Sequence, residues 1–162
     1  MSHLLRALCL LAAMASPLAA QQADIRFGGL QQDTTLPVEV TSDTLSVDQA
    51  TGAAVFTGNV LAKQGEMRLT AGAIRVEYTA AGDGIDRLLA TDGVTLVSPT
   101  DAAEAREAVY TIASGTVVMT GDVLLTQGNA AISGEKLTVN LKDGTGTMTG
   151  RVRSVFTPGG AP

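Results

Sequence analysis

The chain has 162 residues, with 11 Lys and Arg against 16 Asp and Glu, a formal net charge of −5, and a single Cys and a single His. This length suits one domain. The acidic balance argues against binding to nucleic acid and against electrostatic docking to an anionic membrane surface.

Residues 1–20 have the three-part plan of a secretory signal peptide: a basic residue, an apolar run at 7–15, and small residues before a predicted cleavage near Ala20. The run is too short to span a bilayer as a helix. Cys9 and His3 both lie in this segment, so the mature chain is predicted to lack thiols and imidazoles. This argues against Ser-His-Asp triads, zinc sites of thiolate or imidazole, and disulfides.

Residues 21–35 are polar and without clear periodicity, and we expect a flexible N-terminal arm. From 36 to 156, short alternating runs separated by Gly, Asn or Asp predict a single all-β domain. Residues 101–108 are rich in Ala and Glu and are interpreted as a loop leading into a strand, and residues 157–162 as a loose tail. Strands are expected at 38–40, 45–48, 54–57, from 60, and at 67–70, 74–78, 85–90, 94–97, 109–112, 116–119, 123–125, 131–132, 137–141 and 152–156.

The chain contains an internal repeat, which indicates a regular stacked architecture. Residues 56–65 recur as 119–128, and a tetrapeptide of the type Thr-Gly-Asn-Val begins at Thr57, Thr91, Thr120 and Thr149. Its central residues are interpreted as turn residues that tolerate a left-handed backbone, in preference to calcium ligands. Because aromatic residues are scarce, a β-solenoid-like stack or an open jelly roll, filled by aliphatic side chains, is favoured over an immunoglobulin-like sandwich.

Paired carboxylates are the remaining catalytic option. Asp83 with Asp86 and Glu104 with Glu107 are candidates, but solvated surface charge is the favoured interpretation. We therefore expect no enzymatic activity, no metal site and no cofactor.

Apolar residues of one parity form stripes along the predicted strands. Phe56, Val60 and Ala62 share a parity across Gly58, and the repeat shows the same pattern. The stripes are typical either of a dry core or of a long groove for acyl chains, and the pattern alone favours the core. If they line a groove, Leu45, Val47, Ile74 and Val76 belong to the candidate lipid-binding set as well.

The order of these motifs resembles the OstA-like family of periplasmic lipopolysaccharide-transport proteins. The resemblance covers roughly residues 36–142 and rests on motifs shared in order and spacing: Pro37-Val-x-Val40, Ser42-Asp43, Phe56-Thr-Gly-Asn-Val60, Gln64-Gly65, Val76-x-Tyr78, Ala108-x-Tyr110, Thr120-Gly-x-Val123, Gln127-Gly128 and Gly134-x-Lys136-Leu137. Two departures are the tetrapeptide at 91–94, whose glycine comes one place late, and a short region after Leu141.

The resemblance implies an incomplete β-jelly roll, V-shaped in section, whose units join head to tail by pairing of edge strands. It implies a periplasmic bridge between an LptC-like inner-membrane protein and an LptD-like outer-membrane protein, with the acyl chains of lipid A held in the apolar interior. Family positions that contact lipid correspond to Val38, Val40, Leu96, Tyr110 and Ile112. The alternative is a purely structural β-solenoid interaction module of the cell envelope.

Overall fold

A computed structural model describes residues 23–26 and 29–158, and within these ranges all regular structure is β, which confirms the predicted class. There is no helix among them that is long and apolar enough to cross a membrane. The strands are β1 (Ala23–Arg26), β2 (Glu39–Thr41), β3 (Thr44–Val47), β4 (Ala54–Gln64), β5 (Met67–Tyr78), β6 (Ile85–Thr91), β7 (Val94–Val97), β8 (Asp101–Ala105), β9 (Glu107–Thr111), β10 (Thr116–Gln127), β11 (Ala130–Asn140), β12 (Thr145–Thr149) and β13 (Arg153–Phe156).

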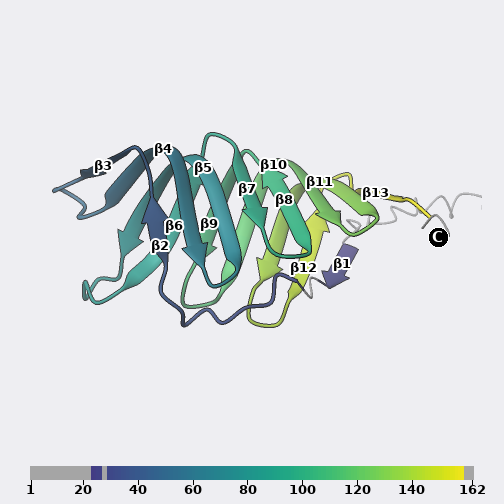
Figure 1. The fold of residues 1–162 in the computed structure, drawn as a ribbon, viewed down its shortest axis with the longest axis horizontal. Helices are drawn as coiled ribbons and strands as arrows, with labels where there is room; N and C mark the ends of the chain where they lie inside the picture. Colours follow the sequence, from purple (N-terminus) through teal and green to yellow (C-terminus); the bar gives the residue numbers. More distant parts are fainter. Residues whose placement is uncertain (1–22, 27–28, 159–162) are drawn as a thin grey trace, which may run out of the picture.

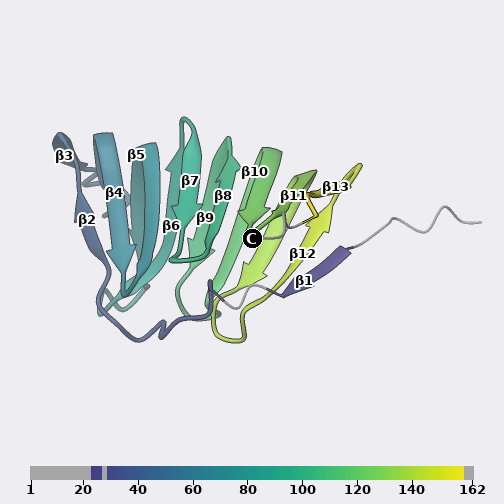
Figure 2. The ribbon, with the colours of Figure 1, turned by 45° about the vertical axis from the view of Figure 1, so that its right-hand side comes forward.

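All thirteen strands belong to one antiparallel sheet that folds into two layers. The first layer contains β3, residues 54–57 of β4, 73–78 of β5, β6, β9, 116–120 of β10, 136–140 of β11, β12 and β1. The second layer contains β2, residues 60–64 of β4, 67–71 of β5, β7, β8, 123–127 of β10, 130–134 of β11 and β13. Figures 1 and 2 show the resulting stack, with β2 and β3 at one end and β12, β13 and β1 at the other.

The chain passes between the layers at a row of corners, and four of them coincide with the repeated tetrapeptides. Two consecutive residues at each of these four corners have positive φ: Gly58 (80°) and Asn59 (46°), Asp92 (65°) and Gly93 (80°), Gly121 (87°) and Asp122 (48°), and Gly150 (84°) and Arg151 (46°). Gly, Asn and Asp adopt this left-handed backbone at the lowest cost. The prediction of turn residues is confirmed, and the reversed order at 92–93 is accommodated because both central positions are left-handed.

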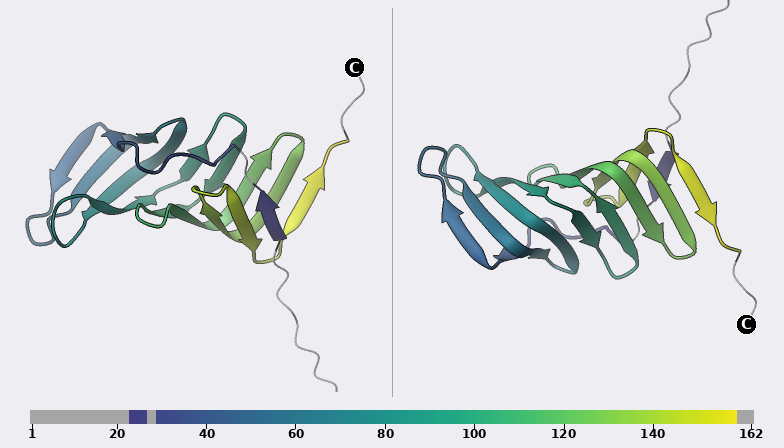
Figure 3. Two further views of the ribbon diagram at one scale, coloured as in Figure 1. Left: turned by 90° about the horizontal axis from the view of Figure 1, so that it is seen from below. Right: turned by 90° about the horizontal axis from the view of Figure 1, so that it is seen from above.

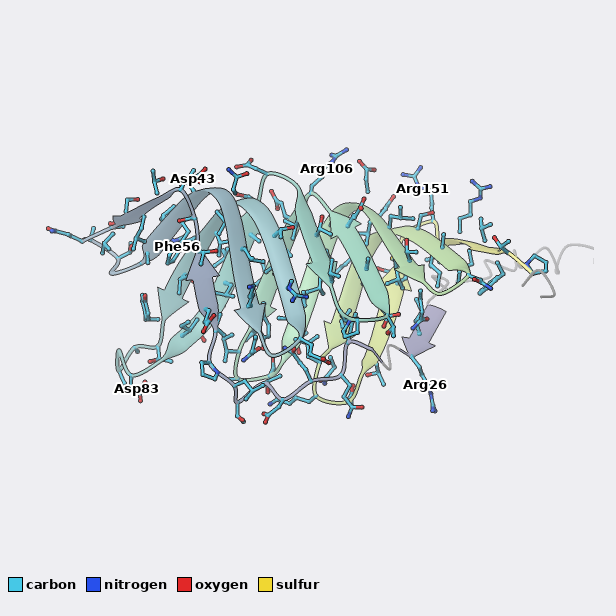
Figure 4. All side chains as sticks on the ribbon, viewed as in Figure 1. Arg26, Asp43, Phe56, Asp83, Arg106 and Arg151 are labelled. Carbon is cyan, nitrogen blue, oxygen red and sulfur yellow. The ribbon has the colours of Figure 1, made fainter. Side chains whose placement is uncertain are left out.

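These corners form one long edge of the molecule, and polar side chains join neighbouring corners along it. The Asn59 side chain donates to Asp43 Oδ2 (2.8 Å), and the Arg151 guanidinium donates to Glu135 Oε1 (2.7 Å). Figure 4 shows Asp43, Arg106 and Arg151 along this edge. The sequence predicted a break between two strands at Gly58. Instead, β4 continues through Gly58, with a shift of register between Thr57 and Val60.

The prediction of a loop at residues 101–108 is wrong. Residues 101–105 form β8, which pairs with β7 and with β10, and β9 begins at Glu107. Ala103 and Ala108 are buried while Glu104 is exposed, so the segment alternates like any half-buried strand. Pairing on both sides overrides the helical propensity of Ala and Glu.

The prediction of a flexible arm at 21–35 is also wrong for the described part of that segment. Residues 23–26 form β1, which pairs with β12 from Ala23 opposite Met148 to Arg26 opposite Thr145. The Leu30 side chain is only 2% exposed and belongs to the hydrophobic core. β structure therefore begins before the predicted domain boundary at 36.

The predicted signal peptide, 1–20, and residues 159–162 of the predicted tail lie outside the described residues. The beginning of the tail is held in place, since the backbone N–H of Thr157 donates to the carbonyl of Asn129 (3.0 Å).

Candidate functional site

The inner faces of the two layers enclose one continuous apolar interior. Period-2 alternation brings every second side chain of each strand into this space. Five of the predicted lipid-contacting residues lie deep inside it, each at most 2% exposed: Val60, Ile74, Val76, Leu96 and Tyr110. The interior is thus packed by the protein's own side chains, as the core interpretation of the stripes predicted.

Four more of the predicted residues, Val38, Val40, Phe56 and Ile112, are partly buried and pack against this core. Val40 faces the interior from β2, since its register partner Ala62 is buried there. These residues are inward-facing positions that water can still reach in part.

The interior is open at both ends of the stack. Leu45 and Val47 on β3 stand opposite the inward-facing Phe56 and Ala54, yet they are 57% and 62% exposed, because β3 is the last strand of the first layer and has a neighbour, β4, on one side only among the described residues. At the other end, Phe156 shares the inward parity of β13 and is 70% exposed. Leu45 and Val47 lie on the inner face, where the period-2 pattern placed them, and their exposure follows from their position at the end of the stack.

One polar contact crosses the interior. The Tyr110 hydroxyl on β9, in the first layer, donates to Gln64 Oε1 on β4, in the second layer (2.6 Å). Both side chains are buried, with exposures of 0% and 1%. Burial away from water raises the pKa of Tyr110 to about 12, against a weaker lowering effect of the Gln64 hydrogen bond.

Replacing Tyr110 by Phe is expected to remove an alkaline loss of stability. Tyr110 ionises near pH 10 in the unfolded chain but near 12 when folded, so the unfolded state binds fewer protons between these values and stability falls as pH rises through them. Two pH units correspond to about 2–3 kcal/mol. Denaturant unfolding from pH 8 to 12 should show the wild type losing this much more stability than Tyr110→Phe; parallel curves would contradict the assignment.

The sequence did not predict two residues that take part in the interior, Leu30 and Gln64. Leu30 was hidden in a polar segment that carries no periodic signal. Gln64 was visible only as part of a repeated Gln-Gly pair, and its partner in the repeat is Gln127. The structure gives both glutamines the same task, because each donates from its amide to backbone carbonyls of the N-terminal segment: Gln64 to Thr34 (3.0 Å) and Leu36 (2.8 Å), and Gln127 to Arg26 (2.9 Å).

The candidate carboxylate pairs lie at the surface. Asp83, Glu104 and Glu107 are exposed, and the partly exposed Asp86 lies 3.8 Å from the Arg87 guanidinium. A hollow of about 450 Å³ lies on the outer face of the first layer, beside Arg26 and Thr138. Neither feature includes any of the predicted lipid-contacting residues, so the interior remains the candidate site.

The chain is similar in sequence to a known protein family and to individual proteins. Residues 39–145 match the model of a family described as LptA/(LptD N-terminal domain) LPS transport protein. The chain is 31% identical over 156 residues to an uncharacterized protein of Rhizobium meliloti (strain 1021), covering 90% of this chain and 84% of that protein. It is 30% identical over 120 residues to the lipopolysaccharide export system protein LptA of Escherichia coli (strain K12), covering 68% of this chain and 63% of the relative.

The fold agrees with these matches. The crystal structure of LptH from Pseudomonas aeruginosa, described as the LptA homologous periplasmic component of a lipopolysaccharide transport device, superposes with a TM-score of 0.70 at 18% identity. The superposition covers 78% of this chain and 99% of that structure. The two-layered stack of this chain is therefore the same fold, and the chain belongs to the family of lipopolysaccharide-transport proteins that comprises LptA and the N-terminal domain of LptD.

Proposed function

We propose that this chain is a periplasmic carrier of lipopolysaccharide, which shields the acyl chains of lipid A between its two layers during passage from the inner to the outer membrane. The observation that carries the proposal is the apolar interior, which runs between the layers and is open at both ends of the stack. The names of its relatives support the same role. The predicted signal peptide accounts for export to the periplasm.

Transport of this kind needs no catalytic group. Moving an acyl chain from water into an apolar interior yields about 0.8 kcal/mol for each buried CH₂. The phosphates and sugars would stay in solvent, where the acidic protein offers them no strong cationic partner. The eleven candidate lining residues named above, Leu45 and Val47 at the open end included, are the proposed lipid contacts.

The edges of the sheet support a bridge built by pairing of strands. Within the described residues, β2 and β3 pair only with β4, β13 only with β11, and β1 only with β12, so each offers an unpaired edge. Addition of another β2 to β13, which would be antiparallel, and of another β3 to β1, which would be parallel, would continue both layers. The proposed partners are further copies of this chain, head to tail, an LptC-like protein of the inner membrane and an LptD-like protein of the outer membrane.

Site-specific photo-crosslinking tests the carrier role. A photoreactive phenylalanine analogue at Phe56, on the inner face, is expected to crosslink to lipopolysaccharide in cells, whereas the same analogue at neighbouring Val55, on the outer face, is expected not to. A purely structural module would give no lipid crosslink from either position. Depletion of the protein should in addition leave newly made lipopolysaccharide at the inner membrane.

A further inference from the structure

Residues 29–38, which lead into β2, run along the edge of the molecule opposite the corners. We call these residues the strap, and the edge that they follow the open edge. β1 and β2 stand at opposite ends of the strand order, so the chain between them has to travel along the stack. Figure 1 shows it beneath the strands, and Figure 3 shows it crossing the molecule when seen from below.

The strap is bonded to both layers at the open edge. The backbone N–H of Gln32 donates to the carbonyl of Leu141, where the first layer turns after β11 (2.8 Å). The Gln64 amide, at the end of β4 in the second layer, donates to the strap carbonyls of Thr34 and Leu36. The strap therefore joins two layers that are otherwise connected covalently at the corner edge.

Two strap side chains reach the interior: Val38 packs against the core from beside β2, and Leu30 lies within it. Leu30 is 2% exposed and is part of the same core cluster as Leu96 and Tyr110. Beside it, Gln32 donates to Gln64 Oε1 (3.1 Å), the atom that also accepts from Tyr110. A single amide thus links the strap, the second layer and the first layer.

The strap is held less firmly than the strands. Residues 29–38 belong to no strand, so the strap has no ladder of backbone hydrogen bonds. A cavity of about 220 Å³ adjoins it, lined by Leu30, Leu36, Met67 and Ser98 among others. Among the described residues, the Oε1 atom of Gln32 is buried without a hydrogen-bond partner. Segments with few cooperative contacts open locally while the rest of the fold stays intact.

We propose that the strap is a gate: it lifts from the open edge to admit an acyl chain, which takes the place of Leu30 between the layers. This proposal rests on the carrier function above. The interior is filled when the strap is closed, so lipid entry requires space, and Leu30 is an apolar group that a neighbouring segment can withdraw without breaking the sheet. Tyr110 and Gln64 remain bonded to each other when the strap lifts, whereas the Gln64 amide loses its acceptors on Thr34 and Leu36 and has to donate to water admitted at the open edge.

A disulfide across the strap tests the gate. A Cβ added at Gly29 would lie 3.0 Å from Cβ of Thr100, on the turn between β7 and β8, and 2.7 Å from Asp101 Oδ2. The two Cβ atoms are within reach of a disulfide once the segment moves outward by about 0.5–1 Å, since a disulfide spans about 3.5–4.5 Å between Cβ atoms. Gly29→Cys with Thr100→Cys, in a chain carrying Cys9→Ala, should therefore lock the strap beside Leu30 on oxidation. The measurement is the rate at which purified lipopolysaccharide displaces a fluorescent fatty acid from the protein in stopped flow.

We expect the oxidised protein to bind lipopolysaccharide about tenfold more slowly than the same protein reduced, because the competent open state is withheld. The matched control is Thr70→Cys with Thr95→Cys, two register partners on β5 and β7 that do not touch the strap. Its rate should not depend on oxidation. Equal rates for the locked and reduced strap would overturn the gate and leave the carrier function standing, whereas absence of binding by the wild type would overturn both.

A second variant keeps the test independent of the disulfide. Leu30→Ala removes most of the side chain that holds the strap in the core, so the open state should be more populated and association about threefold faster or more. An unchanged or slower rate, with the melting transition still cooperative, would contradict the gate.

Discussion

Replacing Val40 by Asp is expected to weaken lipopolysaccharide binding by about tenfold or more, because an ionised carboxylate among acyl chains loses its hydration without gaining a partner. Val40 suits the test since it faces the interior from β2 but is only partly buried, so the fold should tolerate the change better than at Leu96, which is fully buried. Binding would be measured by equilibrium titration of the purified protein with lipopolysaccharide.

The matched control is Thr41→Asp, one residue along the same strand. Thr41 is exposed and lies opposite Leu61, on the outer face of the sheet. It adds the same charge to the same strand, so its effect on binding should stay within about twofold, the scale of exposed surface electrostatics. Equal weakening by both variants would show that net charge, and not the interior, controls binding.

The corners were predictable because their chemistry is local. A pair of left-handed residues can be occupied at low cost by Gly with Asn or Asp, so each of the four corners left the same trace in the sequence. The same logic explains why the order of the two residues at 92–93 is immaterial. Arg151 is the exception, a left-handed residue with a long side chain, and its position was recognised only through the repeat.

The strap and β8 were not predictable for the opposite reason. β8 consists of residues that favour helices, and it is a strand because β7 and β10 pair with it on both sides. The strap owes its place to Leu30 and to two partners far away in the sequence, the Gln64 amide and the Leu141 carbonyl. Such contacts join residues that are far apart in the sequence, so a pattern of neighbouring residues does not predict them.

The sequence predicted which side chains face the interior, but not which of them remain exposed at its ends. Alternation identified which side chains face inward, and Ile74, Val76 and Leu96 lie where it placed them. It could not show that Leu45 and Val47 remain exposed, because their exposure depends on β3 being the last strand of its layer. Nor could it show that Tyr110 would meet Gln64 across the interior. The proposed head-to-tail assembly would form at these exposed residues.

Phe156→Asp is expected to prevent head-to-tail association, so that the protein stays monomeric at concentrations about tenfold above those at which the wild type forms larger species. Phe156 is 70% exposed on β13, where the joint would bury it against the next copy, and a carboxylate buried there without a partner would oppose pairing of the edges. The measurement is molar mass by light scattering or sedimentation as a function of concentration.

Leu124→Asp provides the control, because Leu124 is also an exposed large apolar residue, at 39%, but lies on β10 in the middle of the stack. If the joint forms at the ends, this variant should assemble like the wild type. Loss of association in both variants would point to general repulsion between acidic chains, and a wild type that stays monomeric throughout would contradict the homo-oligomeric bridge. Where Phe156→Asp alone fails to assemble, the inner face at the end of the stack is continued by the next molecule, and the apolar interior becomes a path longer than one chain.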